Sequence, residues 1–268
     1  RMGKRQFPRW SDLKPIIGFK SPFSRSDEVS RAVTISQLRS IAKAKTPRAV
    51  FDYTDGAAGE ELSYARAYEA YRQLEFHPRV LRDVSKVDTS IKVFGTESAL
   101  PFIFSPTGFT RMMHYHGEAA VAKVAAEFGI PYTLSTLGTT SIEDLAAAAP
   151  NTRRWFQLYL WRDKTTRYEL VERAASAGYE AIMLTVDTVV GGMRVRDVNN
   201  GLTIPPQLTF KTMADMARYP KWWGNLLTSA PLEFASLKST GGTVAELMNS
   251  VFDPSITMKD VDWLKQNW

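Results

Sequence analysis

The sequence predicts an α/β fold in which parallel strands are joined by helical crossovers. Short apolar runs begin near residues 102, 132, 155 and 181, and turns and stretches with helical spacing lie between them. A strand, loop and helix that repeat in this way are typical of a parallel sheet. The runs are apolar throughout rather than alternating, which indicates strands that are covered on both faces. The pattern alone leaves two architectures open, a closed barrel and an open doubly wound sheet.

Composition favours one large folded domain and narrows the classes of partner. Of the 268 residues, 44% are hydrophobic and 23% are charged, which is enough apolar material for a core. Cysteine is absent, so disulfides and thiolate metal sites are excluded, and no metal site is predicted. The net charge of +6 favours anionic partners such as a phosphorylated cofactor, a carboxylate substrate or an anionic membrane surface. No nucleic-acid-binding module is recognisable, so nucleic acid is not an expected partner.

The N-terminal part is predicted to form an arm followed by two short helices. Residues 1–33 are basic and aperiodic, which indicates an arm over the surface. Thr34 and Gln37 have the spacing of a capping box at the start of a helix. Pro47 is suited to open a second short helix, and Gly56 is suited to end it.

The repeating part is predicted to contain four strands and the helices between them. The predicted strands are 102–104, 132–134, 155–159 and 181–186, and the predicted helices are 120–128, one from Thr140 with Glu143 completing a capping box, and 164–177. Residues 188–256 interrupt this rhythm and are predicted to be a loop insertion. A last helix is expected from the capping box at Thr257 and Asp260 to Trp268.

Polar residues gather where these four strands end. They are Ser105, Pro106, Thr107 and Gly108, then Ser135 and Thr136, then Gln157 and Tyr159, and finally Thr185 and Asp187. Parallel α/β folds build their sites at the carboxyl ends of strands. For a single residue, a capping or core role is the simpler interpretation, but four strands together favour a site. Amide and hydroxyl groups can hydrogen-bond a heteroaromatic ring, and Gly108 leaves room for one to approach.

Several sequence strings, taken together, resemble a known family. They are Phe51–Tyr53, Phe76–Val84, Ser105–Gly108, Leu134–Thr136, Trp155–Tyr159, Leu184–Asp187, Arg194–Asp197 and Phe252–Ser255. In this order and spacing the chain resembles the FMN-dependent 2-hydroxy-acid dehydrogenase/oxidase family, and it looks most like the bacterial quinone-type L-lactate dehydrogenases. The resemblance implies a TIM-type (β/α)8 barrel. This chain is expected to supply the N-terminal arm over 1–33 and, over 34–268, roughly the first four β/α units.

The resemblance also implies roles for individual residues. The residues that match the family's FMN-binding positions are Pro106, Thr107, Gly108, Ser135, Gln157 and Thr185. Tyr53 and Tyr159 match the two tyrosines that face the substrate, and Tyr53 is expected to contact its carboxylate. Arg194 matches a loop arginine near the substrate entrance. Asp187 matches the aspartate that orients a catalytic histidine, so Asp187 and Tyr159 are the candidate catalytic residues.

The implied reaction is the FMN-dependent oxidation of an L-2-hydroxy acid, above all L-lactate, with electrons passed from the flavin to quinone or oxygen. Tyrosine hydroxyls and arginine suit an anionic substrate, and a histidine–aspartate pair suits proton removal. The implied protein is a homo-oligomer, a tetramer, in the cytoplasm. The insertion places Trp222 and Trp223 beside basic residues, which suits peripheral contact with the inner face of the cell membrane. A lid or an oligomer contact over the barrel mouth is the alternative.

The resemblance also places a base histidine, a carboxylate-binding arginine and a lysine near the flavin on later strands, which this sequence does not contain. His77, His114 and His116 are not assigned as the base. We therefore expect the C-terminal remainder of the barrel to be a partner of this chain. Two alternatives remain: a different FMN-binding barrel enzyme, such as an isomerase, and a non-catalytic half-barrel. Leu137 stands where some oxidases have tryptophan, so the resemblance leaves the substrate's size open.

Overall fold

The computed structural model describes residues 28–188, 190–201, 203–204, 210–236, 242–243 and 252–268. Its contacts divide the chain into two units, residues 1–44 and 45–268. The first unit holds a 3-10 turn, η1 (Val29–Arg31), and most of helix α2 (Ile35–Lys45). The predicted capping box is confirmed, because the Gln37 N–H donates to Thr34 Oγ1 and the Thr34 N–H donates to Gln37 Oε1, each at 3.2 Å. Most of the predicted arm, residues 1–27, lies outside the described residues.

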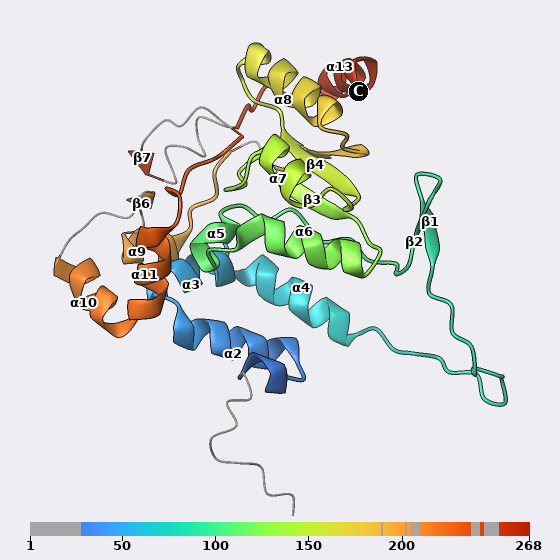
Figure 1. Cartoon of the computed structure of the whole chain (residues 1–268), viewed down its shortest axis with the longest axis horizontal. Helices are drawn as coiled ribbons and strands as arrows, with labels where there is room; N and C mark the ends of the chain where they lie inside the picture. Colours follow the sequence, from blue (N-terminus) through green and yellow to red (C-terminus); the bar gives the residue numbers. More distant parts are fainter. Residues whose placement is uncertain (1–27, 189, 202, 205–209, 237–241, 244–251) are drawn as a thin grey trace, which may run out of the picture. The chain divides into compact units, whose positions relative to one another are not determined.

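The second unit is organised around a parallel sheet of strands β3 (Tyr132–Ser135), β4 (Arg154–Tyr159) and β5 (Ala181–Thr185), in that order (Figure 1). The predicted strands near 132, 155 and 181 are therefore confirmed. The register sets Ser135 opposite Gln157 and Tyr159 opposite Thr185. The carboxyl ends of the three strands consequently lie at one edge, as the sequence predicts for a site.

The strand predicted at 102–104 is not formed as a strand. Phe104 alone makes a parallel bridge to Tyr132, in which the Phe104 N–H donates to the Pro131 carbonyl at 3.1 Å and the Thr133 N–H donates to the Phe104 carbonyl at 3.0 Å. Pro101 has no N–H to donate, and the Phe102 side chain is mostly exposed, so little burial stabilises a longer pairing. The chain nevertheless passes beside β3 where a further parallel strand would lie.

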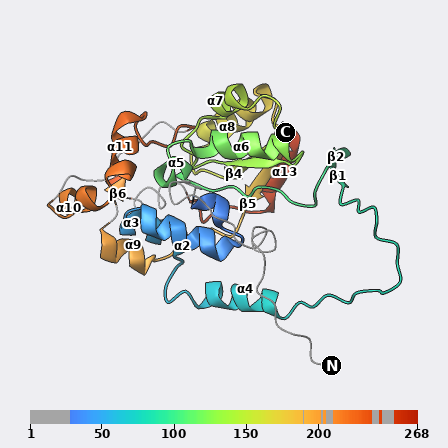
Figure 2. The same ribbon diagram turned by 60° about the horizontal axis from the view of Figure 1, so that its bottom comes forward.

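Helices α6 (Gly117–Glu127), α7 (Ile142–Ala148) and α8 (Lys164–Ser176) cover one face of this sheet (Figures 1 and 2). Phe156 and Leu158 of β4 are fully buried in the core formed with these helices. Because side chains alternate along a strand, the residues between them face the opposite side of the sheet. That side carries the polar residues of the predicted site.

Helix ends follow the predicted signals with one correction. Gly178 ends α8 in the left-handed conformation, with φ of 72°, as its position predicted. The box predicted at Thr140 and Glu143 is wrong by one residue, because Ser141 caps α7 and accepts the Asp144 N–H at 3.0 Å. Thr140 instead donates its hydroxyl to Glu118 at 2.8 Å. The reason is that the Glu118 carboxylate is fully buried and needs donors.

The part of the second unit that precedes the sheet contains both expected and unexpected elements. It consists of α3 (Arg48–Asp55), α4 (Leu62–Arg72), the antiparallel hairpin of β1 (Ile91–Val93) and β2 (Thr96–Ser98), and α5 (Thr110–Met113). Helix α3 between Pro47 and Gly56 confirms a prediction, whereas α4 and the hairpin were not predicted. Phe94, in the turn of the hairpin, packs on Trp155 with ring centroids 5.3 Å apart, at the amino end of β4.

The predicted insertion, residues 188–256, contains secondary structure in its described parts. These elements are α9 (Val195–Asn200), β6 (Thr203–Ile204), α10 (Phe210–Arg218), α11 (Pro220–Thr228) and β7 (Gly242–Thr243). Helix α13 (Met258–Asn267) follows, and its capping box is confirmed by the Thr257 N–H, which donates to Asp260 Oδ2 at 2.8 Å. The buried guanidinium of Arg167 in α8 pairs with Asp253 at 2.6 Å and with Asp260 at 2.9 Å. These pairs attach the end of the insertion and α13 to α8.

Candidate active site

A cavity of about 220 Å³ lies at the carboxyl ends of the strands. Its lining residues are Tyr53, Pro106, Gly108, Ser135, Leu137, Gln157, Tyr159, Thr185 and Arg194. They come from α3, from the loop after Phe104, from the sheet, from the loop after β3 and from the residue that precedes α9. The structure thus brings the predicted site residues together in one cavity, except Thr107 and Asp187.

Ser135, Gln157 and Thr185, here called the sheet wall, form a neutral hydrogen-bonded row across three strands. Ser135 Oγ donates to Gln157 Oε1 at 3.1 Å, and the N–H of Thr136 donates to the same oxygen at 3.2 Å. On its other side, Gln157 Nε2 donates to Thr185 Oγ1 at 2.8 Å. Ser135 and Gln157 are buried, so these bonds satisfy groups that water does not reach. The strand register places the three side chains and fixes which atoms meet.

The loops that follow Phe104 and β3 pack directly against each other at the cavity. The Phe109 N–H donates to the Leu137 carbonyl at 3.1 Å. A Cβ atom on Gly108 would lie 3.3 Å from both Leu137 Cβ and the Leu137 carbonyl oxygen, which is a tight contact. Glycine at 108 therefore allows this approach and keeps the cavity open beside Pro106.

Tyr53, Arg194 and Asp197, here called the helix wall, form a charged cluster between α3 and α9. The Arg194 guanidinium lies 5.1 Å from the centroid of the Tyr53 ring, and its Nη2 donates to the backbone carbonyls of Tyr53 and Gly56. Its Nε lies 2.5 Å from Asp197 Oδ2. Burial raises the pKa of the Tyr53 hydroxyl to about 12, although the Arg194 charge opposes this. Tyr53 is therefore protonated at neutral pH and is able to donate a hydrogen bond.

Asp197 belongs to this cluster, although no role was predicted for it. The signal was present, because Arg194 and Asp197 are three residues apart in a segment that forms a helix, a spacing that brings opposite charges together. It was missed because the insertion was predicted to be a loop. Leu137 lines the cavity beside Ser135, as its position in the loop after β3 allows.

Tyr159 lines the cavity, whereas the two remaining candidates do not. Burial raises the pKa of the Tyr159 hydroxyl, and the negative charge of Asp187 adds to the effect. Asp187 is thus electrostatically close to Tyr159, but its side chain is exposed beyond the end of β5. Thr107 is also exposed, and its carbonyl accepts the hydroxyl of Thr110 at 3.1 Å at the start of α5.

An apolar cluster supports the helix wall and contains the two tryptophans of the insertion. Trp222 and Trp223 are buried in it with Val50 of α3 and with Leu137. Trp222 Nε1 donates to the Met112 carbonyl at 3.0 Å. This burial contradicts the interpretation of these two tryptophans as membrane-interface residues, and it favours the alternative of a segment packed over the barrel mouth. The sequence could not decide, since tryptophan suits both environments.

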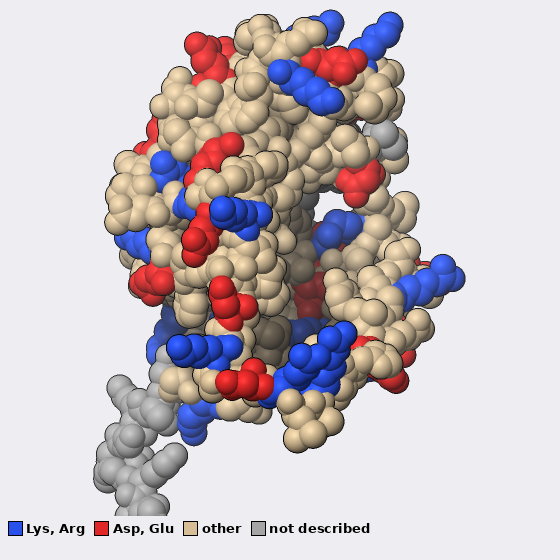
Figure 3. Space-filling view, turned by 90° about the vertical axis from the view of Figure 1, so that its right-hand side faces the viewer, with Lys and Arg blue, Asp and Glu red and all other residues tan. Residues whose placement is uncertain are grey.

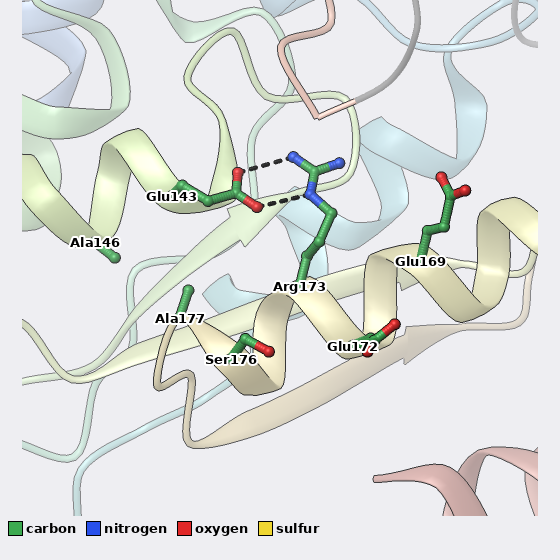
Figure 4. Close-up of a pocket in the computed structure, with 7 residues that line it drawn as sticks. All are labelled: Glu143, Ala146, Glu169, Glu172, Arg173, Ser176 and Ala177. Atoms are coloured by element: carbon green, nitrogen blue, oxygen red, sulfur yellow. Dashed lines mark hydrogen bonds and ion pairs between the residues drawn. The ribbon is translucent and has the colours of Figure 1, made fainter.

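A second hollow, of about 480 Å³, lies between α7 and α8 (Figure 4). The acidic side chains Glu143, Glu169 and Glu172 line it, together with Arg173. Arg173 forms two bonds to the Glu143 carboxylate, at 2.7 and 2.8 Å. Because this cation is already paired and the hollow lies away from the strand ends, it is not a candidate for the predicted chemistry.

The rest of the described surface offers few other sites. On the face shown in Figure 3, basic and acidic side chains are interspersed. The rings of His114 and His116 are 4.9 Å apart but exposed, and no group of three His, Cys, Asp or Glu side chains able to hold a metal was found among the described residues. Within the same residues, no helix combines the length and apolar character needed to cross a bilayer.

Comparisons with known proteins show the family to which the chain belongs. The model of a family described as FMN-dependent dehydrogenase matches residues 42–268. The chain is 52% identical over 266 residues to a protein of Mycobacterium tuberculosis named "Putative L-lactate dehydrogenase", covering 98% of this chain and 64% of the relative. It is 32% identical over 241 residues to a 2-hydroxyacid oxidase of Dictyostelium discoideum, covering 90% of this chain and 57% of that protein.

Among solved structures, the chain resembles the monotopic membrane protein (S)-mandelate dehydrogenase with a TM-score of 0.81 and 30% sequence identity. The match covers 89% of this chain and 64% of that one. The chain therefore spans less than two thirds of the length of each of these three relatives.

Proposed function

Because the chain belongs to the FMN-dependent dehydrogenase family, we propose that its protein oxidises an L-2-hydroxy acid, with L-lactate first among the substrates, to the 2-oxo acid. The TIM-type (β/α)8 barrel predicted from the sequence is the fold of this family, and the chain supplies part of it. Relatives named as L-lactate dehydrogenases support the choice of substrate. The observation that carries the proposal is the cavity in which the neutral sheet wall meets Tyr53 and Arg194.

The residues of the sheet wall fit the ring system of FMN. They offer neutral amide and hydroxyl groups at hydrogen-bonding spacing, which suit the edge of a heteroaromatic ring better than a metal ion or a phosphate. The cavity is smaller than the roughly 300–1,000 Å³ of complete ligand sites, so these residues line part of one. We assign FMN contacts to the side chains of Ser135, Gln157 and Thr185 and to the main chain of Pro106, Thr107 and Gly108. When bound, FMN accepts the two electrons that leave the substrate.

The helix wall is assigned to the substrate's carboxylate. The Tyr53 hydroxyl remains protonated well above neutral pH and donates a hydrogen bond. The Arg194 guanidinium is held in place by Asp197 and adds a charge-assisted bond to the same anion. Tyr159 also keeps its proton, since burial and Asp187 raise its pKa, so it donates to a substrate oxygen rather than acting as a base.

The proton of the substrate's hydroxyl group requires a base from elsewhere in the protein. None of the three histidines of this sequence lines the cavity. We propose that the C-terminal remainder of the barrel supplies a histidine as the base. The carboxylate of Asp187 is exposed just beyond β5, and we propose that it stabilises the positive charge that this histidine acquires.

Intact mass and a visible absorption spectrum of the purified protein are the first test, followed by anaerobic mixing with L-lactate. We expect flavin bands that bleach with L-lactate and not with D-lactate. Arg194→Met should abolish bleaching at low substrate concentration, whereas Arg66→Met, at an exposed arginine of α4, should not. A flavin that no 2-hydroxy acid reduces, whether lactate, glycolate or mandelate, would favour the isomerase alternative. A folded protein that binds no flavin would favour a non-catalytic half-barrel.

Quinone or oxygen is the proposed electron acceptor, and oxygen consumption during turnover separates the two. For a quinone, we propose peripheral membrane contact from the cytoplasmic side through α10 and α11. Phe210 is 93% exposed, and Met213 and Leu227 are also exposed, whereas Trp222 and Trp223 are buried. The relative described as a monotopic membrane protein supports this contact.

Flotation with anionic lipid vesicles tests the membrane contact. A variant with Phe210→Asp and Met213→Asp should lose flotation, while Met258→Asp, at an exposed methionine of α13, should keep it. Equal flotation of the two variants would contradict a contact through α10. The proposed homo-oligomer, a tetramer, is measured on the same samples by light scattering.

A further inference from the structure

Arg196 lies close to the cavity without lining it, and the proposed function assigns it no role. Its Nη1 lies 3.1 Å from Asp55 Oδ2 and 3.7 Å from Asp52 Oδ1, and its Nη2 donates to Glu61 Oε2. The Arg196 guanidinium, on α9, thus contacts three carboxylates. Two of them are on α3, and the third belongs to the residue before α4. The Arg196 side chain is 37% exposed, whereas the side chains of its acidic partners are mostly buried.

The aliphatic part of the Arg196 side chain also packs against Gly56. A Cβ atom at this position would lie 3.1 Å from Arg196 Cδ and 2.7 Å from the Asp52 carbonyl oxygen. The Ala57 N–H donates to Glu61 Oε1 at 3.1 Å, which orients the carboxylate toward Arg196. The contact is therefore a built arrangement of backbone, stem and charge rather than a surface ion pair between two mobile side chains.

Other hydrogen bonds join the segment around Arg196 to the same part of the chain as Gly56. The Gly59 N–H donates to the Met193 carbonyl at 2.8 Å, and Asn200 Nδ2 donates to Asp52 Oδ2 at 2.8 Å. The segment 193–200 therefore lies along residues 52–61. Its N-terminal end carries Arg194, which reaches the cavity, and its middle carries Arg196, which reaches the acidic residues.

We propose that Arg196 is a positioning residue that docks α9 on α3 and thereby holds Arg194 and Tyr53 together for the substrate anion. Arg194 and Tyr53 come from segments far apart in the sequence, and Arg196 supplies charged bonds that join these segments directly. When this docking is lost, a smaller fraction of the protein has both groups in place. The apparent affinity for the anion then falls by the same factor, because only the docked fraction binds it. This inference rests on the proposed function.

Kinetics of the FMN-loaded protein with L-lactate give the first arm of the test. Arg196→Met should raise KM about tenfold or more while kcat changes by less than about threefold, because saturating substrate restores the docked state. Arg196→Lys should be intermediate, since one ammonium group cannot reach both Asp55 and Glu61 in the way a guanidinium fork does. Arg66→Met is the matched control and should leave both constants unchanged.

Hydrogen exchange gives a second arm that needs no turnover. In the substrate-free protein, Arg196→Met should speed amide exchange in 194–200 and leave β4 as in the wild type. Glu61→Gln, which keeps Arg196, should have the same effect, and the double variant should add little to either single change. Gly56→Ala should also speed this exchange, because the added methyl would lie 2.7 Å from the Asp52 carbonyl oxygen and 3.1 Å from Arg196 Cδ, so both the end of α3 and the Arg196 side chain must shift.

The two arms separate the failure of this inference from the failure of the proposed function. If the wild type oxidises no 2-hydroxy acid, the proposed function fails, and exchange in 194–200 still tests the docking. If KM rises in Arg196→Met while exchange in 194–200 is unchanged, Arg196 acts on the substrate itself and the positioning role is refuted. Unchanged KM and unchanged exchange refute it as well.

Discussion

The sheet wall and the helix wall line one cavity but are stabilised by different interactions. In the sheet wall, Ser135, Gln157 and Thr185 sit on paired strands and are joined by neutral hydrogen bonds. In the helix wall, Tyr53 and Arg194 come from α3 and the start of α9, and ionic contacts of Arg196 join these segments. The sheet wall therefore depends on backbone pairing and burial, and the helix wall depends on charge.

This difference suggests a division of labour in the proposed reaction. A cofactor that stays bound through many turnovers needs fixed neutral partners, and strands hold side chains more rigidly than loops do. A substrate that enters and leaves at every turnover needs groups that can open, and partly exposed ionic contacts are weaker and respond to solvent.

The largest effects are expected in the two apolar clusters beneath the walls. Phe156→Ala, in the core between β4 and the helices, should lower the free energy of unfolding by about 3–5 kcal/mol. Trp222→Ala should lower it by about 3 kcal/mol, because Trp222 packs under α3 beside Leu137. Urea unfolding followed by circular dichroism measures both. Phe102→Ala, at an exposed ring, is the control and should change it by less than about 0.5 kcal/mol.

The second prediction breaks the sheet wall alone. Gln157→Leu keeps the side-chain volume similar but leaves the Ser135 hydroxyl without its acceptor and the Thr185 hydroxyl without its donor. The Thr136 N–H keeps its bond to the backbone carbonyl of residue 157. We expect a loss of about 2–4 kcal/mol in the free energy of unfolding and FMN binding weakened by about tenfold or more. Fluorescence titration with FMN measures the affinity, and Gln266→Leu on the surface of α13 is the control. Unchanged affinity would remove Gln157 from the proposed flavin contacts.

The sequence predicted the sheet wall better than the helix wall, and the reason is physical. Strands β4 and β5 appear as continuous apolar runs, and the alternation of side chains then places Gln157 and Thr185 on one face. The strand pairing follows from the repeat itself. Even the wrong prediction of a strand at 102–104 was close to the observed structure, because Phe104 pairs with Tyr132 where the strand was expected.

The helix wall was recognised from resemblance and not from pattern. Helix α9 is six residues long and lies in a segment without apolar periodicity, so local signals did not predict it. Its position depends on contacts between Arg196 and residues about 140 positions earlier, which no local pattern encodes. The burial of Trp222 and Trp223 likewise depends on the distant residues Val50 and Met112.

The third prediction uses acid to separate the two walls. The backbone bond from Ala57 lowers the pKa of Glu61, burial opposes this, and Arg196 lowers it further. Because its pKa is lowered, the carboxylate stays charged and keeps its ionic contact at every pH above the usual carboxyl pKa. It loses that contact as the pH falls through the lowered pKa. The groups of the sheet wall do not titrate in this range. Between about pH 6 and pH 3, exchange in 194–200 should therefore accelerate beyond its intrinsic rate, while exchange in β4 should not.

The control for this acid effect is Arg196→Met, in which exchange in 194–200 should be fast already at neutral pH and change little on acidification. A parallel acceleration in β4 would mean that acid loosens the whole unit. In that case the contrast between the walls would not hold.

The smallest effect is expected from Arg48, an exposed charge of α3 outside the helix wall. Arg48 lies 3.3 Å from Asp52 one helical turn later, but its side chain is 85% exposed. Arg48→Ala should change the free energy of unfolding by less than about 0.5 kcal/mol and leave KM for L-lactate unchanged, because water screens such a pair. Asp52 keeps its bond to Asn200, so α9 stays docked. A KM increase as large as that of Arg196→Met would mean that net charge on α3, rather than the docking of α9, positions the substrate groups.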